Sequence, residues 1–340
     1  MRKLIPVWEP TTLEFPESSG PGRHKKAKSE RVRKIENFLI KTILEIQKTI
    51  DFTPGSRGWC YLLEQHGLKK GDFSRAEKVI GDARKDGRLP LDICSDDTNR
   101  SFQNIEKINR NTPREEAREF VEWIIESDHE NYIPFSFWDT QEYYIEVVVE
   151  KIDLIQLFKG VCATYHVPIA NSRGWPDLNM RAEMMKRFQY WERRDHNCIL
   201  LLCGDHDPAG LLISKSYRKM LNDLKNAVGW SPKHLLIERF GLNEDLINEE
   251  NLSWIENLMT SKNRDLKNSK EKYVQEYIKK YGVRKVEANA LVTRPNVARN
   301  LIESTLNKYI SKDSVRSYNH QIKIQQLEVK RIINEMVINN

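Results

Sequence analysis

Two stretches of the chain consist almost entirely of apolar residues with strong β-propensity, and acidic residues follow both. Residues 145–149 lead directly to Glu150, and residues 199–203 precede Asp205 and Asp207. Apolar runs with little polar alternation are typical of parallel strands that helices cover on both faces. Open α/β sheets bind ligands just beyond the carboxyl ends of their strands. We therefore predict two buried parallel strands that deliver carboxylates to one edge of a sheet.

Helical periodicity dominates the region before residue 105. Apolar residues recur at intervals of three and four over 29–51, and two shorter amphipathic patterns follow over 56–66 and 73–84. An Asp-Gly turn and a short strand-like segment at 91–94 come next. Three helices with a wing-like turn are typical of a winged helix-turn-helix domain, whose recognition helix lies in the major groove of DNA.

The third of these helices presents the basic residues Arg75, Lys78 and Arg84. In a recognition helix they would contact DNA. The alternative interpretation is a solvated, charged helix face. Further candidates for contacts with nucleic-acid phosphates are Arg57, Arg173, Lys215 and Arg218.

These patterns predict an α/β chain in which an N-terminal winged helix-turn-helix precedes a Rossmann-like parallel sheet with helical additions. The expected segments are a flexible basic arm (1–30), a winged-helix domain (31–105), a linker helix (106–141), the parallel-sheet domain (142–310) and a C-terminal helix (311–340).

The acidic residues after the two strands suit a divalent cation. Asp205 and Asp207 are two residues apart, so an extended backbone points both side chains to the same side. Carboxylates that converge with Glu150 at one sheet edge repel one another, and oxygen ligands of this kind prefer Mg²⁺ or Mn²⁺. Pro208 then ends the strand, and Gly210 lets the chain turn into a helix. The alternative interpretation is a polar loop that only caps this helix.

The composition indicates the general class of protein but does not identify a function. The 340 residues carry a formal charge of +6, which is compatible with an anionic partner but does not require one. Five cysteines without metal-ligand spacing fit a reducing compartment. The chain has neither a run long enough to span a membrane nor a signal-peptide core. We expect a cytoplasmic, nucleoid-associated protein.

The order of these motifs resembles a known family. A strand ending at Glu150, then a helix, then a strand ending in Asp205-x-Asp207 resembles a Toprim domain. The segments VEKIDL (149–154), SRGWPDLNMR (172–181) and LLCGDHDPAG (201–210) are similar to the A subunit of topoisomerase VI and the meiotic double-strand-break transesterase. They are more similar still to small phage and bacterial proteins that pair a winged helix with this Toprim type. The resemblance implies that Glu150, Asp205 and Asp207 hold Mg²⁺.

The resemblance also covers the helical region. SRGWCYLLEQHG (56–67) matches the family's R-x-x-x-Y pattern with Arg57 and Tyr61, although Cys60 stands where an aromatic residue is common. In the topoisomerase subunit the matching tyrosine attacks the DNA phosphate, so Tyr61 is a candidate nucleophile. The alternatives are that Tyr61 is a core residue and that metal-activated water attacks. Glu287, in a VE-x-x-AL segment, is a candidate neighbour of the metal site.

These observations favour a Mg²⁺-dependent enzyme that cleaves DNA phosphodiesters. By analogy with the family we expect a homodimer, and a complete topoisomerase would need an ATPase partner subunit. Two alternatives stay open. One is a Toprim nuclease directed at RNA, for instance in defence against phage. The other is a DNA-binding or assembly protein without catalytic activity.

Overall fold

A four-stranded parallel sheet forms the centre of the molecule. The computed structural model describes residues 10–16, 25–95, 111–260 and 264–338. The strand order is β2-β1-β3-β4, and every neighbouring pair is parallel. The predicted mixed α/β fold with a buried parallel sheet is therefore confirmed. The strands are β1 (Tyr143–Val149), β2 (Ile169–Asn171), β3 (Asn197–Cys203) and β4 (Leu236–Gly241).

The two central strands end at the same level, and this register positions the acidic residues. Val149 of β1 pairs with Cys203 of β3. Immediately beyond this pair, the N–H of Glu150 donates to the Cys203 carbonyl over 2.9 Å. Glu150 and the loop that begins at Gly204 therefore leave the sheet side by side.

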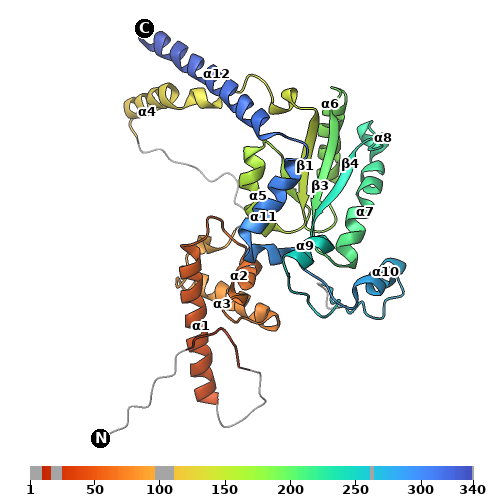
Figure 1. The fold of residues 1–340 in the computed structure, drawn as a ribbon. Coiled ribbons are helices and arrows are strands. Elements are labelled where there is room, and N and C mark those ends of the chain that lie inside the picture. Colours follow the sequence, from red (N-terminus) through yellow and green to blue (C-terminus); the bar gives the residue numbers. More distant parts are fainter. Residues whose placement is uncertain (1–9, 17–24, 96–110, 261–263, 339–340) are drawn as a thin grey trace.

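Helices cover both faces of the sheet (Figure 1). α5 packs with α11 on one face, and α6 packs with α7 on the other. After β2 the chain crosses back past β1 and adds β3 on its other side. Because parallel crossovers are right-handed, the helices before and after this step cover opposite faces of the sheet. The helices of this region are α5 (Ile152–Thr164), α6 (Leu178–Glu192), α7 (Pro208–Asn222), α8 (Lys225–Val228), α9 (Glu244–Glu249), α10 (Lys272–Tyr281), the 3₁₀ helix η6 (Ala288–Thr293) and α11 (Pro295–Leu306).

Residues 25–95 form a helical domain whose buried side chains are continuous with the hydrophobic core of the sheet. Its α-helices are α1 (Lys25–Gln47), α2 (Ser56–Glu64) and α3 (Phe73–Lys85), with 3₁₀ turns η1 (Lys70–Asp72) and η2 (Leu91–Ile93). Trp59 and Ile80 are almost completely buried between them. The basic arm predicted for 1–30 lies largely outside the described residues, and α1 already begins at its end.

The strand expected at 91–94 is wrong. This segment is the 3₁₀ turn η2, and the indole N–H of Trp59 donates to the Ile93 carbonyl over 2.7 Å. That hydrogen bond holds the segment against the helices, so it does not pair with a second strand. No strand occurs in the described residues 25–95, and the end of the predicted winged-helix domain, 96–105, lies outside the described residues.

The helical domain docks on the sheet domain through a buried aspartate. Asp153, at the start of α5, accepts hydrogen bonds from the backbone N–H of Gly55 and from the Asn289 amide. A Cβ at Gly55 would lie 2.8 Å from an Asp153 oxygen, and a Cβ at Gly58 would lie 2.9 Å from the same carboxylate. Only glycine at these two positions lets α2 approach so closely.

Two further helices extend from the body side by side (Figure 1). α4 (Pro113–Glu126) begins with a capping box between Thr112 and Glu115, and it packs against α12 (Lys312–Ile338). The 3₁₀ turns η4 (Asp128–Asn131) and η5 (Phe137–Thr140) connect α4 to β1. Within the described parts of the chain, no helix has the length and apolarity needed to cross a membrane.

Candidate active site

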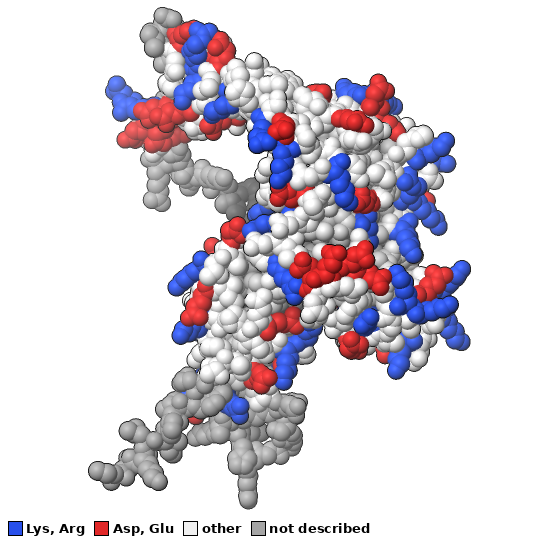
Figure 2. Space-filling view, viewed as in Figure 1, with Lys and Arg blue, Asp and Glu red and all other residues white. Residues whose placement is uncertain are grey.

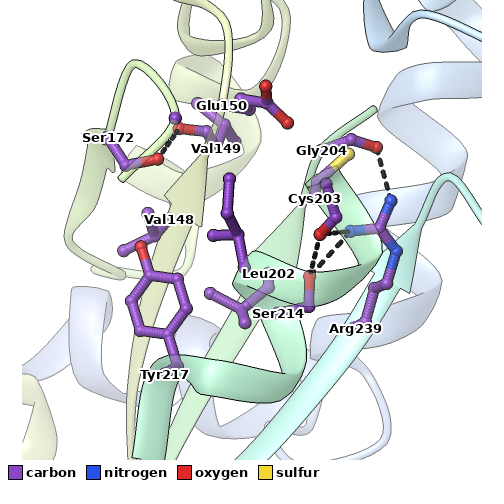
Figure 3. Close-up of a pocket in the computed structure, with 13 residues that line it drawn as sticks. Val148, Val149, Glu150, Ser172, Leu202, Cys203, Gly204, Ser214, Tyr217 and Arg239 are labelled. Carbon is purple, nitrogen blue, oxygen red and sulfur yellow. Dashed lines mark hydrogen bonds between the residues drawn. The ribbon is translucent and has the colours of Figure 1, made fainter. Parts of the chain in front are cut away.

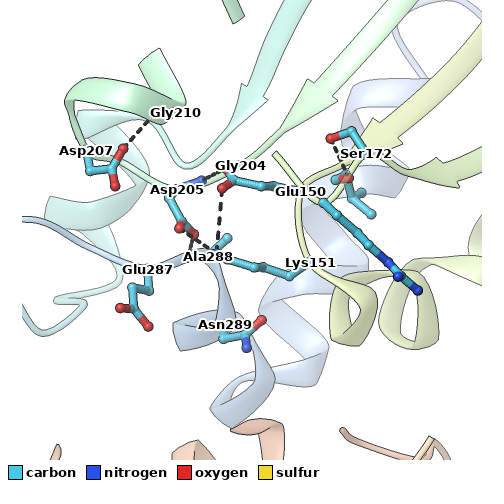
Figure 4. A network of polar contacts seen from close by, with 12 residues as sticks. Glu150, Lys151, Ser172, Gly204, Asp205, Asp207, Gly210, Glu287, Ala288 and Asn289 are labelled. Carbon is cyan, nitrogen blue, oxygen red and sulfur yellow. Dashed lines mark hydrogen bonds and ion pairs between the residues drawn. The ribbon is translucent and has the colours of Figure 1, made fainter. Parts of the chain in front are cut away.

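Glu150, Asp205 and Asp207, here called the strand-end carboxylates, lie together at the carboxyl edge of the sheet (Figure 4). Glu150 Oε2 accepts the backbone N–H of Asp205 at 2.9 Å, which joins the ends of β1 and β3. Asp205 Oδ1 accepts the N–H of Ala288 at 2.8 Å. Asp207 caps α7, because its Oδ1 accepts the N–H of Gly210 at 2.7 Å. One backbone donor therefore orients each carboxylate.

The strand-end carboxylates are an unfavourable group of charges. Burial raises the pKa of Glu150, and the neighbouring charge of Asp205 raises it further. Burial also raises the pKa of Asp207, and Asp205 again adds to the effect. Both shifts have the cause expected when like charges share a site that is poorly solvated. A positive charge placed between them would remove this cost.

Lys151 supplies part of that positive charge. Its Nζ lies 2.8 Å from Asp205 Oδ2 and 3.6 Å from Glu150 Oε1. Burial opposes the charged form of this lysine, but the two carboxylates raise its pKa. The sequence showed Lys151 as the neighbour of Glu150, yet nothing in the pattern indicated that its side chain folds back over the acidic residues.

Arg239 fixes the backbone that carries the aspartates (Figure 3). It projects from β4, and its Nη2 donates to the carbonyls of Gly204 at 2.7 Å and Asp205 at 2.8 Å. Its Nη1 donates to Ser214 Oγ of α7 at 2.7 Å. A cavity of about 20 Å³ beside these groups has room for a single water. Sequence reasoning missed Arg239; the available signal was an arginine inside a strand-like segment, HLLIERF.

Tyr61 and Arg57 meet Glu287 behind the strand-end carboxylates, and with Lys285 they form what we call the Glu287 cluster. The Tyr61 hydroxyl donates to Glu287 Oε2. Arg57 Nη2 lies 3.4 Å from the same oxygen, and Lys285 Nζ lies 3.3 Å from Oε1. Although burial opposes it, these donors lower the pKa of Glu287 to about 2. Glu287 adjoins the strand-end carboxylates, because the N–H of the next residue, Ala288, donates to Asp205.

The environment of Tyr61 does not favour a phenolate. The side chain is 1% exposed. Burial raises its pKa, and the negative charge of Glu287 adds to the increase. A nucleophilic hydroxyl needs an effective base or a lowered pKa, and it must reach the substrate. The Tyr61 hydroxyl contacts the Glu287 carboxylate, but with a pKa lowered to about 2 that carboxylate is a weak base. In this arrangement Tyr61 is a buried donor that supports Glu287.

The other predicted nucleic-acid contacts are dispersed, and several have structural partners. In the helical domain, Arg75 stacks on Phe15 with 4.2 Å between the guanidinium carbon and the ring centre, and Arg84 donates to the Leu91 carbonyl at 2.9 Å. Arg218 donates to the Leu235 carbonyl at 2.6 Å. The remaining candidates, Lys78, Arg173 and Lys215, are exposed.

The side chains at the sheet edge suit Mg²⁺ or Mn²⁺ in their chemistry. Their donors are carboxylate oxygens, which these cations prefer. Among the described residues, no group of three or more His, Cys, Asp or Glu side chains is arranged so that it could hold a metal ion without some rearrangement. Because the Lys151 ammonium lies between Glu150 and Asp205, a metal that binds both carboxylates would have to displace it.

Comparisons with known proteins add no relative: no protein-family model matches the chain, and no curated protein matches it.

Proposed function

We propose that this protein is a metal-dependent DNA-cleaving enzyme of the Toprim type, in which Glu150, Asp205 and Asp207 hold Mg²⁺ or Mn²⁺. The observation that supports it best is the direct contact of Glu150 with the backbone of Asp205 at the ends of two parallel strands. The raised pKa values of Glu150 and Asp207 add a second argument, because these charges need a cation.

The residues divide the work of phosphodiester cleavage among them. Glu150, Asp205 and Asp207 would hold the cation through their carboxylate oxygens, and Asp207 also caps α7. Lys151 neutralises the carboxylates in the free protein, and with a cation bound its ammonium would be available to contact a phosphate oxygen. A bound Mg²⁺ would lower the pKa of a coordinated water and stabilise the negative charge that develops on the phosphate. Arg239 keeps the loop in place.

Water is the nucleophile in this proposal. Tyr61 is buried, its hydroxyl donates to Glu287, and its pKa is raised. An attack by Tyr61 would require α2 to leave the position in which Asp153 and Glu287 bind it. The helical domain of α1 to α3 serves to bind the duplex, with exposed basic residues such as Lys78 on phosphates.

Cleavage of supercoiled plasmid in Mg²⁺ or Mn²⁺ tests the proposal. The wild type is compared with Asp205→Asn and with Tyr61→Phe. Asp223→Asn serves as a control, because Asp223 is an exposed aspartate at the C-terminal end of α7. Loss of a metal ligand should slow nicking by at least about 100-fold, whereas the other two variants should remain active.

The products also separate the alternatives. If Tyr61→Phe is inactive and protease treatment releases protein from wild-type DNA ends, the enzyme is a transesterase and water is not the nucleophile. Cleavage of RNA in place of DNA would favour the RNA-directed nuclease. If neither DNA nor RNA is cleaved by the wild type under any metal condition, the proposal of a nuclease is wrong for this chain on its own.

A further inference from the structure

A basic lobe stands beside the strand-end carboxylates. It comprises residues 264–285 and contains α10, whose apolar side packs against α7 as a separate small cluster with Leu258 and Leu266. The lobe contains eight basic and three acidic residues, although the whole chain carries only +6. Figure 2 shows lysine and arginine side chains gathered over it at the lower right. Such a local excess of positive charge attracts a polyanion.

A cavity of about 260 Å³ lies between the lobe and α7. On one side Tyr273, Tyr277 and Tyr281 line it, and their spacing of four residues places them on one face of α10. On the other side Leu211 and Leu212 of α7 complete an apolar wall. A cavity with aromatic walls of this kind suits a planar ring.

The polar groups of the cavity match the remaining parts of a nucleotide. Lys215 is exposed at the α7 side and suits a phosphate. Glu276 also lines the cavity, and its carboxylate suits the amino or imino hydrogens of a base. Lys280 lines it as well but already binds Glu244 at 2.9 Å. Aromatic, cationic and acceptor groups therefore occur together, as a nucleotide requires.

The cavity and the carboxylates belong to one short backbone segment. Pro208, which lines the cavity, follows Asp207 directly. The Tyr277 hydroxyl lies 2.9 Å from the carbonyl oxygen of His206, the residue between the two aspartates. A strand with a phosphate at Asp205 and Asp207 would therefore bring an adjacent nucleotide to the cavity.

We infer that the cavity is a subsite for one unpaired base of the strand that is cleaved, next to the scissile phosphate. This inference rests on the proposed cleavage of DNA. A base must leave the duplex stack before it enters a pocket between two helices, so unpaired nucleotides bind at lower cost. Stacking on the tyrosine rings then stabilises the bound base. The enzyme should therefore prefer bulged or single-stranded positions over intact duplex.

Binding of 2-aminopurine DNA tests this subsite. The probe is a short duplex with one bulged 2-aminopurine, compared with the same base fully paired, with Ca²⁺ in place of Mg²⁺ to prevent cleavage. On binding to the wild type, the emission of the bulged base should fall, and its dissociation constant should be about tenfold below that of the paired probe. Equal affinity for both probes, or unchanged emission, overturns the inference.

Variants locate the effect in the cavity. Leu212→Trp fills it, and Tyr273→Ala removes part of an aromatic wall from a partly exposed position. Both should lose the quenching and the tenfold preference while their melting temperatures and their binding of paired DNA stay near those of the wild type. Tyr190→Ala removes an exposed tyrosine of α6, outside the cavity, and should behave as the wild type. If the two cavity variants retain the preference, the inference is wrong.

Asp205→Asn separates failure of the subsite from failure of the proposed function. This variant should still quench the bulged base, because stacking does not need cleavage. If the wild type quenches but cleaves no DNA, the subsite stands and the proposed cleavage does not. If the wild type cleaves bulged and paired DNA equally, and Leu212→Trp leaves that unchanged, cleavage stands and the subsite is overturned.

Discussion

The strand-end carboxylates and the Glu287 cluster are neighbouring groups of buried charge that the protein treats in opposite ways. Glu287 has a hydroxyl, a guanidinium and an ammonium around it, and its pKa falls to about 2. Glu150 and Asp207 have raised pKa values, because burial and Asp205 outweigh their donors. The carboxylate of Glu287 thus has several hydrogen-bond donors and positive charges around it, whereas those of Glu150 and Asp207 have too few to offset burial and mutual repulsion.

The difference indicates which carboxylates serve the fold and which serve a ligand. A buried charge with its full set of donors adds little cost and fixes the groups around it. A buried charge without them makes the folded state less stable, and this cost persists unless a cation relieves it. The predictions below test this division.

Glu287→Ala should cause the largest change. It leaves Lys285, which is 13% exposed, without its carboxylate and the Tyr61 hydroxyl without its acceptor. Breaking a buried ion pair from one side costs about 3–5 kcal/mol in the free energy of unfolding. Urea denaturation measures it, with Glu256→Ala as a control on an exposed glutamate. A loss no larger than that of the control would contradict the structural role of Glu287.

Metal should stabilise the wild type through the strand-end carboxylates. A ligand at 100 times its dissociation constant adds about 2.7 kcal/mol to the free energy of unfolding. The melting temperature of the wild type should therefore rise with increasing Mg²⁺ or Mn²⁺ concentration. At equal ionic strength, the melting temperature of Asp205→Asn should not change. Parallel increases in both proteins would mean that the cation binds elsewhere.

Tyr61→Phe should cost less than Glu287→Ala. It removes one hydrogen bond to a charged group, worth about 1.5–3 kcal/mol, while Arg57 and Lys285 remain beside Glu287. Urea denaturation gives the stability, and the plasmid assay should show near-normal cleavage. Tyr144→Phe, which removes another buried tyrosine hydroxyl bonded to a glutamate, is a matched control. Unchanged stability with abolished cleavage would identify Tyr61 as a catalytic group.

Asp207→Asn should act in the opposite direction and raise the urea midpoint slightly while it abolishes cleavage. Asparagine retains the cap of α7 and removes a charge that burial disfavours. The same change at Asp177, the exposed cap of α6, should have little effect on stability. A destabilised Asp207→Asn protein would show that the carboxylate is needed for the fold.

The pH dependence of this gain follows from the raised pKa of Asp207. Below its ordinary value of 3.8 the carboxyl is protonated in both the folded and the unfolded state, so the wild type and the variant should be equally stable. As pH rises above 3.8, the unfolded chain ionises first, and the wild type loses stability relative to the variant until the folded pKa is passed. Glu287 acts oppositely, since its stabilisation is lost as pH falls from 4.5 to about 2. Urea midpoints from pH 2 to 7 measure both effects.

Local pattern was sufficient for the strands and for the position of the acidic residues. Short, almost entirely apolar runs between turn residues favour buried parallel strands, and a strand end fixes where Glu150 and Asp205 emerge. It was insufficient at 91–94, where the tertiary bond from Trp59 outweighed strand propensity.

The partners of the carboxylates depended on contacts that local pattern does not encode. Tyr61 and Glu287 are 226 residues apart, and Arg239 reaches the aspartate loop from a different strand. The position of the Lys151 ammonium is a choice of side-chain rotamer, which sequence spacing leaves open. Such contacts arise only once the sheet order and the docking of α2 are set.

The contact between Asp153 and the start of α2 also limits which helical domains could replace residues 25–95 in an engineered chimera. A foreign helical domain grafted in place of residues 25–95 would need a free backbone N–H at the position of Gly55 and no side chain at either Gly55 or Gly58. It would also need a hydroxyl at the position of Tyr61 to meet Glu287. A chimera with these three features would keep the contacts between the two domains. A chimera without them would leave the carboxylates of Asp153 and Glu287 without their hydrogen-bond donors.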